Sequence, residues 1–258
     1  MEDLYLEHLT WPDVAAALKN GYMTIVIPVG AVEQHGPHLP LCVDAERGTR
    51  LGFEVAKRLG RALVAPTIRV GCSEHHMAFA GTISLRESTL RSVCTDYCVS
   101  LAHHGFTRIC LVPSHGGNFT PLAGMLAELQ GAVSSDCLVQ AYTDLVGFLG
   151  IWRSVLAEAG MGDRVGGHAD AAEGSEMLAI RPELVRMERA EGGFLGETSQ
   201  ELLDRIFTDG LQSVTENGIL GDARGLSAEL GEKCLAEGAD LIASFFSGHD
   251  REELPPHG

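Results

Sequence analysis

Residues 23–44 read MTIVIPVGAVEQHGPHLPLCVD, and this stretch decides the fold that we expect. It opens with a short apolar run that ends at Gly30, which is typical of a strand buried on both faces. A polar segment follows at once, and a helical pattern then extends from Asp44 to Gly60. A buried strand, a turn and a helix in this order form one unit of a parallel sheet.

The same alternation recurs along the rest of the chain. Further apolar runs predict strands at residues 62–70, 108–113 and 137–142. Helical patterns lie at residues 87–104, from about 120 onwards, at 173–180 and between about 221 and 246. This alternation predicts an α/β fold with helices on both faces of a parallel sheet, whose ligands collect beyond the carboxyl ends of the strands. No linker divides the sequence convincingly, so residues 1–258 are expected to form one domain.

Charge and cysteine content limit the partners and the compartment. The formal net charge is −16, from 35 acidic and 19 basic residues, so neither nucleic acid nor an anionic membrane is an expected partner. Seven cysteines without short paired spacing argue against a disulfide framework, and Cys94 and Cys98 are expected to pack in the core. Reduced thiols, an N-terminus unlike a signal peptide and no long apolar stretch predict a soluble, cytoplasmic protein.

The polar part of the opening stretch carries a candidate metal site. Glu33 and His35 are separated by one residue, so in extended backbone their side chains point the same way. The chain turns at Gly36, and Asp44 returns at the start of the next helix. Two carboxylates and an imidazole suit Zn, Mn, Fe(II) or Mg. The alternative is a polar loop in which Asp44 only caps its helix.

Two later segments offer further ligands at the predicted sheet edge. His115 follows the third strand within SHGGN (114–118), whose glycines allow a ligand to approach the backbone. His168 and Glu173 lie in GGHADAAEGS (166–175), where glycines precede a helix start that favours anions. Asp170 in this segment is expected to cap the helix, and Glu176 just after it is expected to be solvated.

Two pairs of adjacent histidines remain. His75 and His76 cannot both face one point in regular structure, and we favour His76 as the one that faces the site. His103 and His104 precede a glycine at a predicted helix end, and we regard them as structural. The three ligand-bearing segments together suggest two metal ions bridged by a carboxylate. Ions about 3.5–4 Å apart can ionise a water between them, which predicts hydrolysis of a carbonyl–nitrogen or comparable bond.

The chain resembles the creatininase (creatinine amidohydrolase) family over most of its length. The motifs that carry the resemblance are LTWP (9–12), PVGAVEQHGPHLPLCVD (28–44), HHMAFAGTISL (75–85), PSHGGN (113–118) and residues 168–185. The resemblance implies a three-layer α/β/α fold with a mostly parallel central sheet. It also implies a site for two divalent metal ions (Zn, Mn or Fe) and frequent assembly into homohexamers.

The resemblance assigns roles by position. The implied metal ligands are Glu33, His35, Asp44 and His115, with Asp44 as the bridge. Creatinine-hydrolysing members have a further glutamate where this chain has Gly117, and we assign that vacancy to Glu173 of the later motif. His168 matches the family's catalytic histidine, which would carry a proton to the leaving nitrogen. We count Glu173 as a second catalytic residue as well as a metal ligand.

The departures from the family concern the substrate. Creatinine-specific members cover their ligand with tryptophans, and this chain has Thr143 and Arg164 at those positions, while Trp152 does not align. Creatinine is therefore not the expected substrate, and Arg164 indicates a more polar or anionic one. The residues expected to bind substrate are His38, His76, Gly116, Gly117, Asn118 and Arg164.

The sequence thus predicts a metal-dependent amidohydrolase that cleaves a C–N bond, other than an ordinary peptide bond, in a small polar or cyclic amide. Other branches of the family resemble formamide hydrolases, peptidases of a redox-cofactor precursor and hydrolases of an oxidised inositol ring. One alternative is therefore a hydrolase that opens a keto-cyclitol or sugar-derived ring. A second is a non-catalytic metal- or ligand-binding relative, for which Gly117 is the only hint.

Overall fold

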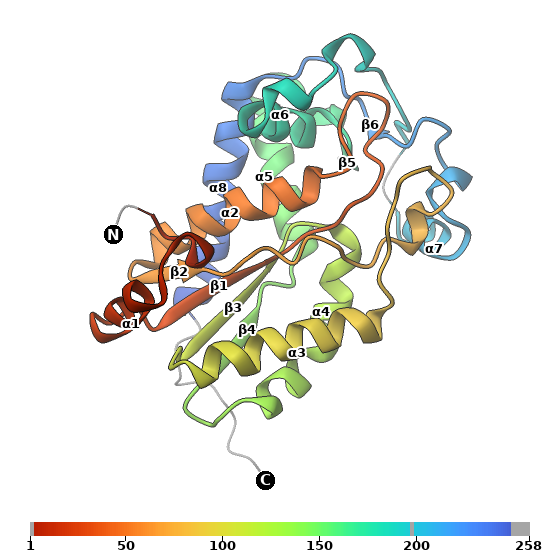
Figure 1. The fold of residues 1–258 in the computed structure, drawn as a ribbon. Coiled ribbons are helices and arrows are strands. Elements are labelled where there is room, and N and C mark those ends of the chain that lie inside the picture. The colour runs from red at the N-terminus through yellow and green to blue at the C-terminus, as the bar shows by residue number, and fades with distance from the viewer. Residues whose placement is uncertain (1–2, 197–198, 249–258) are drawn as a thin grey trace.

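A four-stranded parallel sheet crosses the centre of the molecule in the order β2-β1-β3-β4 (Figure 1). The computed structural model describes residues 3–196 and 199–248. The strands are β1 (Thr24–Val29), β2 (Ala62–Val64), β3 (Arg108–Pro113) and β4 (Leu138–Ala141). All four apolar runs therefore form strands of one parallel sheet. The second strand is shorter than expected, because the chain beyond it meets β1 only through a bridge between Ile68 and Val29.

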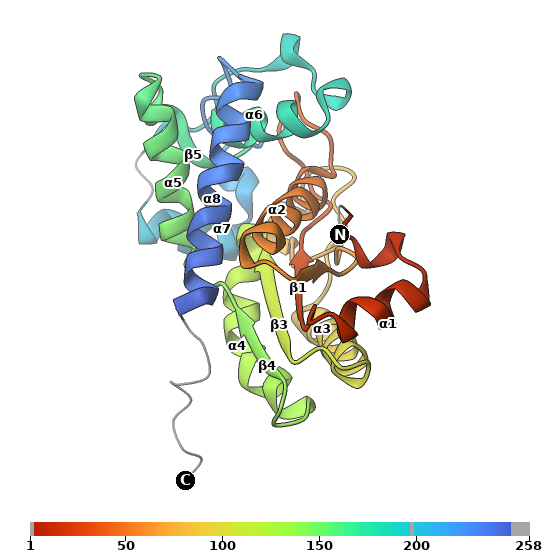
Figure 2. The same ribbon diagram turned by 90° about the vertical axis from the view of Figure 1, so that its left-hand side faces the viewer.

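Helices cover both faces of this sheet, which gives the expected three-layer α/β/α fold (Figures 1 and 2). Successive residues of β1 point to opposite faces. Val26 packs in the core formed with α2 and α8, whereas Ile25 and Ile27 pack in the core formed with α1, α3 and α4. These helices are α1 (Trp11–Lys19), α2 (Val43–Leu59), α3 (Glu87–His103), α4 (Gly116–Ala132) and α8 (Ala228–Gly248).

The second half of the chain builds a cap over one edge of the sheet (Figure 1). Its elements are α5 (Leu145–Glu158), β5 (Val165–His168), α6 (Ala171–Ile180), α7 (Gln200–Asp209) and β6 (Leu220–Gly221). Strands β5 and β6 pair antiparallel as a separate small sheet. Helix α7 and strand β6 lie between residues 181 and 221, where the sequence predicts no element because segments this short give little periodicity. Short 3-10 helices join the elements: η1 (Leu6–His8), η2 (Glu74–His76), η3 (Gly162–Arg164), η4 (Pro182–Leu184), η5 (Met187–Arg189) and η6 (Leu211–Ser213).

The carboxyl ends of β1 and β3 lie side by side, since Val29 pairs with Pro113. The polar segments that follow these two strands therefore begin at the same edge. Gly30 brings a third segment there, because a Cβ at this position would lie 2.8 Å from the Cα of Ala45. Only glycine lets the first turn of α2, which carries Asp44, approach the end of β1 so closely.

The structure also bears on the cysteines and on membrane-spanning helices. Cys94 and Cys98 are buried one turn apart in α3, as expected for core packing, and none of the seven cysteines is in a disulfide. Within residues 3–196 and 199–248, no helix has the length and apolar character needed to cross a bilayer.

Candidate metal centre

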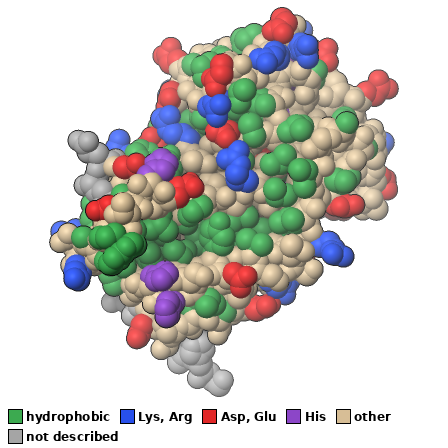
Figure 3. Space-filling model, in the orientation of Figure 1, with side chains coloured by type: hydrophobic (Ala, Val, Ile, Leu, Met, Phe, Trp, Pro, Cys, Tyr) green, Lys and Arg blue, Asp and Glu red, His purple; other side chains and the backbone are tan. Residues whose placement is uncertain are grey.

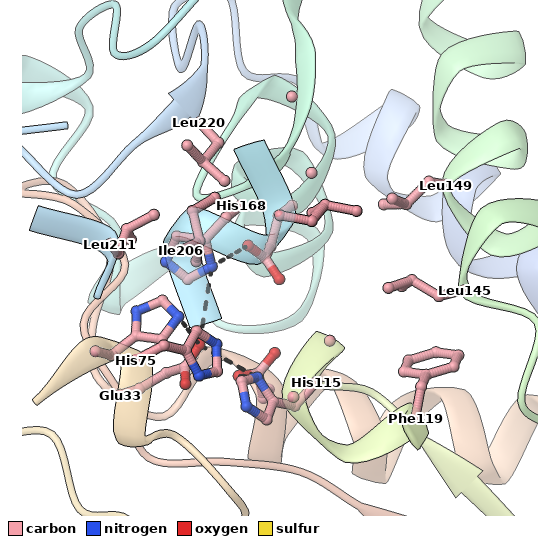
Figure 4. A pocket seen from close by; sticks show the side chains of 18 of the residues that line it. Glu33, His75, His115, Phe119, Leu145, Leu149, His168, Ile206, Leu211 and Leu220 are labelled. Atoms are coloured by element: carbon pink, nitrogen blue, oxygen red, sulfur yellow. Dashed lines mark ion pairs between the residues drawn. The ribbon is translucent and has the colours of Figure 1, made fainter. Parts of the chain in front are cut away.

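A pocket opens beyond the carboxyl ends of β1 and β3, with predicted metal ligands at its base (Figure 4). It encloses about 890 Å³ of space, part of it open to solvent. Glu33 and His115 reach it from the segments after the two strands, and His168 reaches it from the end of β5. Figure 4 shows these polar side chains converging, with Leu145 and Leu149 facing them across the pocket.

The carboxylates at the base are buried, and three of their oxygens lack hydrogen-bond partners among the described residues. Glu33, Asp44 and Glu173 are 0%, 1% and 3% exposed. Neither oxygen of Glu33 accepts a hydrogen bond within the described part of the chain, and the same holds for Asp44 Oδ2. A buried carboxylate without a partner is costly, so cations fit this position.

His35 defines one group of ligand atoms. Its Nδ1–H donates to the main-chain oxygen of Glu33 at 3.1 Å, which leaves Nε2 as the free ring nitrogen. His35 Nε2 lies 3.7 Å from Asp44 Oδ2 and 3.5 Å from Glu173 Oε2, and has no hydrogen-bond partner in the described residues. One nitrogen and two carboxylate oxygens therefore surround one point.

His115 defines a second group of ligand atoms, which also includes Asp44. Its Nε2–H donates to the main-chain oxygen of Cys72 at 2.9 Å, so Nδ1 is the free nitrogen. His115 Nδ1 lies 3.2 Å from Glu33 Oε1 and 3.4 Å from Asp44 Oδ2. Asp44 Oδ2 is therefore shared by both groups, as a bridging ligand would be. A second hydrogen bond that fixes the outer nitrogen of a histidine is the usual arrangement at metal sites.

The two histidines compensate the carboxylate charge when no metal is bound. Burial alone would lower both pKa values. The charges of Glu173 and Asp44 instead raise the pKa of His35 well above its usual value, and the charges of Glu33 and Asp44 raise the pKa of His115 to about 10. The site therefore attracts positive charge strongly, and a divalent ion would supply the same compensation.

His168 lies at the rim of this centre, held by Gln34. Its Nε2–H donates to the main-chain oxygen of Gln34 at 3.0 Å, while Nδ1 lies 3.8 Å from Glu33 Oε1 and 4.0 Å from Glu173 Oε2. Burial, and then the charge of His35, lower its pKa. His168 is thus a neutral imidazole with one nitrogen turned toward the ligands, which suits proton transfer. Sequence reasoning missed Gln34, although it stands between Glu33 and His35.

The adjacent histidines of η2 both line the pocket, so the expectation that only one of them faces it was wrong. His76 Nε2 lies 3.4 Å from Glu33 Oε1, and its Nδ1 accepts from the Gln34 side-chain amide at 3.0 Å. The His75 ring stacks on His115 at 5.7 Å between centroids. The prediction assumed regular structure, whereas a tight 3-10 turn brings both rings to one side.

The other expected substrate contacts divide into two sets. Gly116 and Gly117 line the pocket at the start of α4. Asn118 does not: its amide donates to the main-chain oxygens of Val29 and Gly30 and accepts from the Cys72 N–H, so it ties the strand ends together. Its expected role in substrate binding is not supported.

His38 and Arg164 also lie outside the pocket lining. His38 is fully buried, and neither ring nitrogen has a partner among the described residues; burial lowers its pKa to about 4. Arg164 ends η3 and donates to the main-chain oxygen of Arg224, so it turns away from the pocket. Trp152, which sequence comparison had set aside, lines the pocket from α5. Side-chain direction at an irregular turn cannot be read from its position in the sequence.

Two expectations concern residues of helix α6: the one for Asp170 is confirmed, and the one for Glu176 is wrong. Asp170 caps it, accepting from the main-chain N–H groups of Ala172 and Glu173, as predicted. Glu176 is not solvated but fully buried, and it contacts Arg47 of α2. Arg47 was also missed, although it follows Asp44 by three residues and therefore shares its helix face.

The pocket wall away from the carboxylates is apolar. Its side chains come mainly from α5 and α7 and from the chain after α7: Leu145, Phe148, Leu149, Leu202, Leu203, Ile206, Phe207, Leu211 and Leu220. Arg47 is the only lysine or arginine that lines the pocket in the part of the chain that the structure describes. The expected polar or anionic substrate therefore finds little support in the wall.

Comparison with known proteins gives consistent matches. The family model described as creatinine amidohydrolase matches residues 7–246. The mycofactocin precursor peptide peptidase of Mycobacterium ulcerans is 35% identical over 89% of this chain and 87% of its own length. The creatinine amidohydrolase of Pseudomonas putida is 30% identical over 99% of both chains.

Solved structures agree with these matches. A structure titled "Creatininase Mn" superposes with a TM-score of 0.76 at 27% identity, over 99% of this chain and 100% of that chain. A creatininase variant whose title records a Zn-Zn type has a TM-score of 0.74 at 27% identity, over the same shares of the two chains.

Proposed function

The chain belongs to the creatininase family, and from this premise we propose that it is a hydrolase that cleaves a C–N bond with the help of two divalent metal ions. The observation that carries the proposal is the position of Asp44 Oδ2 between His35 Nε2 and His115 Nδ1. Each of these histidines is fixed through its other nitrogen. The donor set of nitrogen and carboxylate oxygen suits Zn, Mn or Fe(II), and the titles of the Mn and Zn-Zn structures support the first two.

We assign the ligands as two groups that share Asp44. Glu33 and His115 complete one group, and His35 and Glu173 complete the other. Glu173 thus fills the vacancy left by Gly117, and we propose that it acts as a ligand rather than as a separate acid or base. Its Oε2 accepts from the Ala169 N–H at 2.7 Å, which holds the carboxylate toward His35.

Bound ions would polarise the substrate carbonyl and lower the pKa of the attacking water. Proton transfer and the exclusion of water depend on side chains of the protein. His168 Nδ1 is turned toward the ligand carboxylates, and we propose that this nitrogen takes a proton from the attacking water and delivers it to the leaving nitrogen of the substrate. Gln34 holds the opposite ring nitrogen, and the apolar wall excludes water from one side of the scissile bond.

The pocket wall favours a substrate different from the small polar amide that the sequence suggested. A large apolar surface beside the ligands suits an amide that carries a bulky apolar group, such as an aliphatic or aromatic side chain of a peptide. The Mycobacterium ulcerans relative is named a precursor peptide peptidase, and this name supports a peptide as the substrate class beside the small polar amide.

The test is a substrate panel on protein of known metal content. Creatinine, a formyl amide, short peptides ending in apolar residues and a keto-cyclitol are assayed side by side with Mn and with Zn. We expect hydrolysis of the apolar peptides. Less than half an equivalent of tightly bound metal, unchanged by adding Mn or Zn, would contradict the proposal and favour a non-catalytic relative. Turnover of only the keto-cyclitol would favour the ring-opening alternative.

A matched pair of variants tests the wall. Leu149 lines the pocket from α5, whereas Val146 of the same helix is 80% exposed and lies outside the lining. Leu149→Asn is expected to raise KM for an apolar peptide about tenfold or more, because burying a Leu-sized group is worth roughly 1.5–3 kcal/mol. Val146→Asn should leave KM unchanged. Equal KM values for the two variants would remove the wall from substrate binding.

Assembly and location remain predictions from the family and the sequence. Figure 3 shows hydrophobic side chains gathered in a band across one face of the molecule. Large exposed apolar residues include Trp11, Ile83 and Met187. Such surfaces are typical of assemblies that bury them, so we keep the proposal of a homohexamer. Sedimentation equilibrium of the purified chain measures the assembly directly.

A further inference from the structure

A buried charged pair lies directly behind the metal ligands, and the proposed reaction does not use it. Arg47 follows Asp44 by three residues in α2, and Glu176 follows Glu173 by three residues in α6. On a helix this spacing places each residue on the same face as the ligand before it. The two helices thus face each other with a ligand and a charged partner on each. Arg47 is 4% exposed and Glu176 is 0% exposed.

The guanidinium of Arg47 contacts the outer oxygens of two ligands. Its Nη2 lies 3.4 Å from Asp44 Oδ1 and 3.6 Å from Glu173 Oε1, and it also donates to the main-chain oxygen of Ser114. The other oxygens of these carboxylates, Asp44 Oδ2 and Glu173 Oε2, are the ones that face His35 Nε2. One planar cation therefore restrains both carboxylates so that each turns one oxygen to the centre.

Glu176 supplies Arg47 with its own counter-charge. Glu176 Oε2 lies 3.4 Å from Arg47 Nη1, and Glu176 Oε1 accepts from the Trp152 indole N–H at 2.9 Å. The Trp152 ring also lies against the guanidinium, 4.8 Å from its Cζ to the ring centroid. A buried arginine without this acid would be compensated only by the ligand carboxylates, at the expense of their charge for metal ions. With Glu176 ionised the pair adds no net charge to the centre, and burial raises the pKa of Glu176 to about 7.

We propose that Arg47 is a positioning residue that orients Asp44 and Glu173 for two metal ions, and that Glu176 and Trp152 hold it there. This inference rests on the proposed two-metal function. The competing reading is that the cluster only fills the space between α2 and α6. The two readings make different predictions for metal binding. A cluster that only fills space would affect folding when it is altered, but it would leave the geometry of the bound ions unchanged.

The experiment measures metal binding in the absence of substrate. Mn²⁺ titrations give the stoichiometry and affinity, and electron paramagnetic resonance of the loaded protein distinguishes a coupled pair of ions from isolated ions. The variants are Arg47→Met, Arg47→Lys and the double variant Arg47→Met/Glu176→Gln, which removes both charges together. The control is Arg50→Met, because Arg50 lies on the same helix but pairs at the surface with Glu54 and Glu232.

We expect the control and the wild type to bind two equivalents as a coupled pair. Arg47→Met should weaken the second equivalent at least tenfold and give spectra of isolated ions, and Arg47→Lys should recover part of the coupling. If Arg47→Met does not fold, the double variant carries the test, with the same loss of coupling expected in a folded protein. A double variant with wild-type affinity and a coupled spectrum would overturn the inference while leaving the proposed function intact. A wild type that binds fewer than two equivalents would overturn the proposed function itself.

Discussion

Asp44 Oδ2 lies 3.4 Å from His115 Nδ1, and the same oxygen lies 3.7 Å from His35 Nε2. This oxygen is therefore close both to a histidine that follows β1 and to a histidine that follows β3. Because the outer nitrogen of each histidine donates to a main-chain oxygen, neither ring can turn away without losing that hydrogen bond. The loss of Asp44 should consequently affect both ligand groups, whereas the loss of any other ligand should affect one.

We expect Asp44→Asn, which keeps the shape but removes the charge, to reduce bound metal from two equivalents to fewer than one. The activity should fall by about 10³-fold or more, which corresponds to about 4 kcal/mol of transition-state stabilisation. Glu173→Gln should instead retain one equivalent, because Glu173 belongs to one group only. Elemental analysis after gel filtration measures both. Equal metal content in the two variants would show that Asp44 is not the bridge.

Metal binding should strengthen as the pH rises. In the metal-free protein the pKa of His115 is raised to about 10, so its ring is protonated at pH 7, and the pKa of His35 is raised well above its usual value. An ion bound by His115 must displace a proton, so its apparent affinity should rise about tenfold per pH unit below pH 10. Mn²⁺ titrations at pH 6.5, 7.5 and 8.5 test this, and calorimetry in two buffers counts the protons released. Affinity independent of pH would contradict it.

The same pKa values predict the stability of the metal-free protein. A histidine whose pKa is raised on folding stabilises the folded state fully below its unfolded pKa, about 6.5. That contribution is lost as the pH rises through the folded value, which is about 10 for His115. The melting temperature of the metal-free protein should therefore fall between pH 6.5 and 10, and that of the loaded protein should fall less. Parallel melting curves with and without Mn²⁺ measure the difference.

The positions of Glu33 and Asp44 were easier to predict from the sequence than those of Arg47 and Glu176, which lie behind the ligands. Glu33 and Asp44 flank one turn between a strand and a helix, so local geometry alone brings them to the sheet edge. Arg47 and Glu176 are 129 residues apart, and their burial depends on the packing of α2 against α6. A charged residue on a helix is usually solvated, and nothing local distinguishes this pair.

The cap over the site was least predictable. Helix α7 contributes Leu202 and Ile206 to the pocket wall, but it is short and follows a long irregular stretch. Arg164 was placed in the pocket by alignment alone, and the turn of η3 directs it to the main-chain oxygen of Arg224 instead. The strands follow from continuous apolar runs, whereas the substrate-facing wall depends on tertiary contacts that give no periodic signal.

His168→Asn should separate proton transfer from metal binding. The Nδ1 atom of His168 lies 3.8 Å from Glu33 Oε1, close enough that this ring could instead serve as a metal ligand. If it transfers a proton, kcat should fall by roughly 10²–10⁴-fold while two equivalents of metal remain bound. If it is a ligand, the metal content falls together with kcat. Stoichiometry and single-turnover rates on the same preparation distinguish the two roles.

Gly117→Ala should destabilise the protein and weaken its metal binding, because a Cβ there would lie 2.3 Å from the Cys72 carbonyl oxygen and 2.5 Å from His115 Nε2. These atoms form the hydrogen bond that orients His115, so the methyl group would wedge it apart. We expect a loss of about 1–3 kcal/mol in unfolding free energy, typical of overpacking. Gly116→Ala is the matched control, since no atom lies within 4 Å of its Cβ position. Urea unfolding and Mn²⁺ titration of both variants measure the effect, and equal values would contradict it. A larger side chain at position 117 would meet the same obstruction.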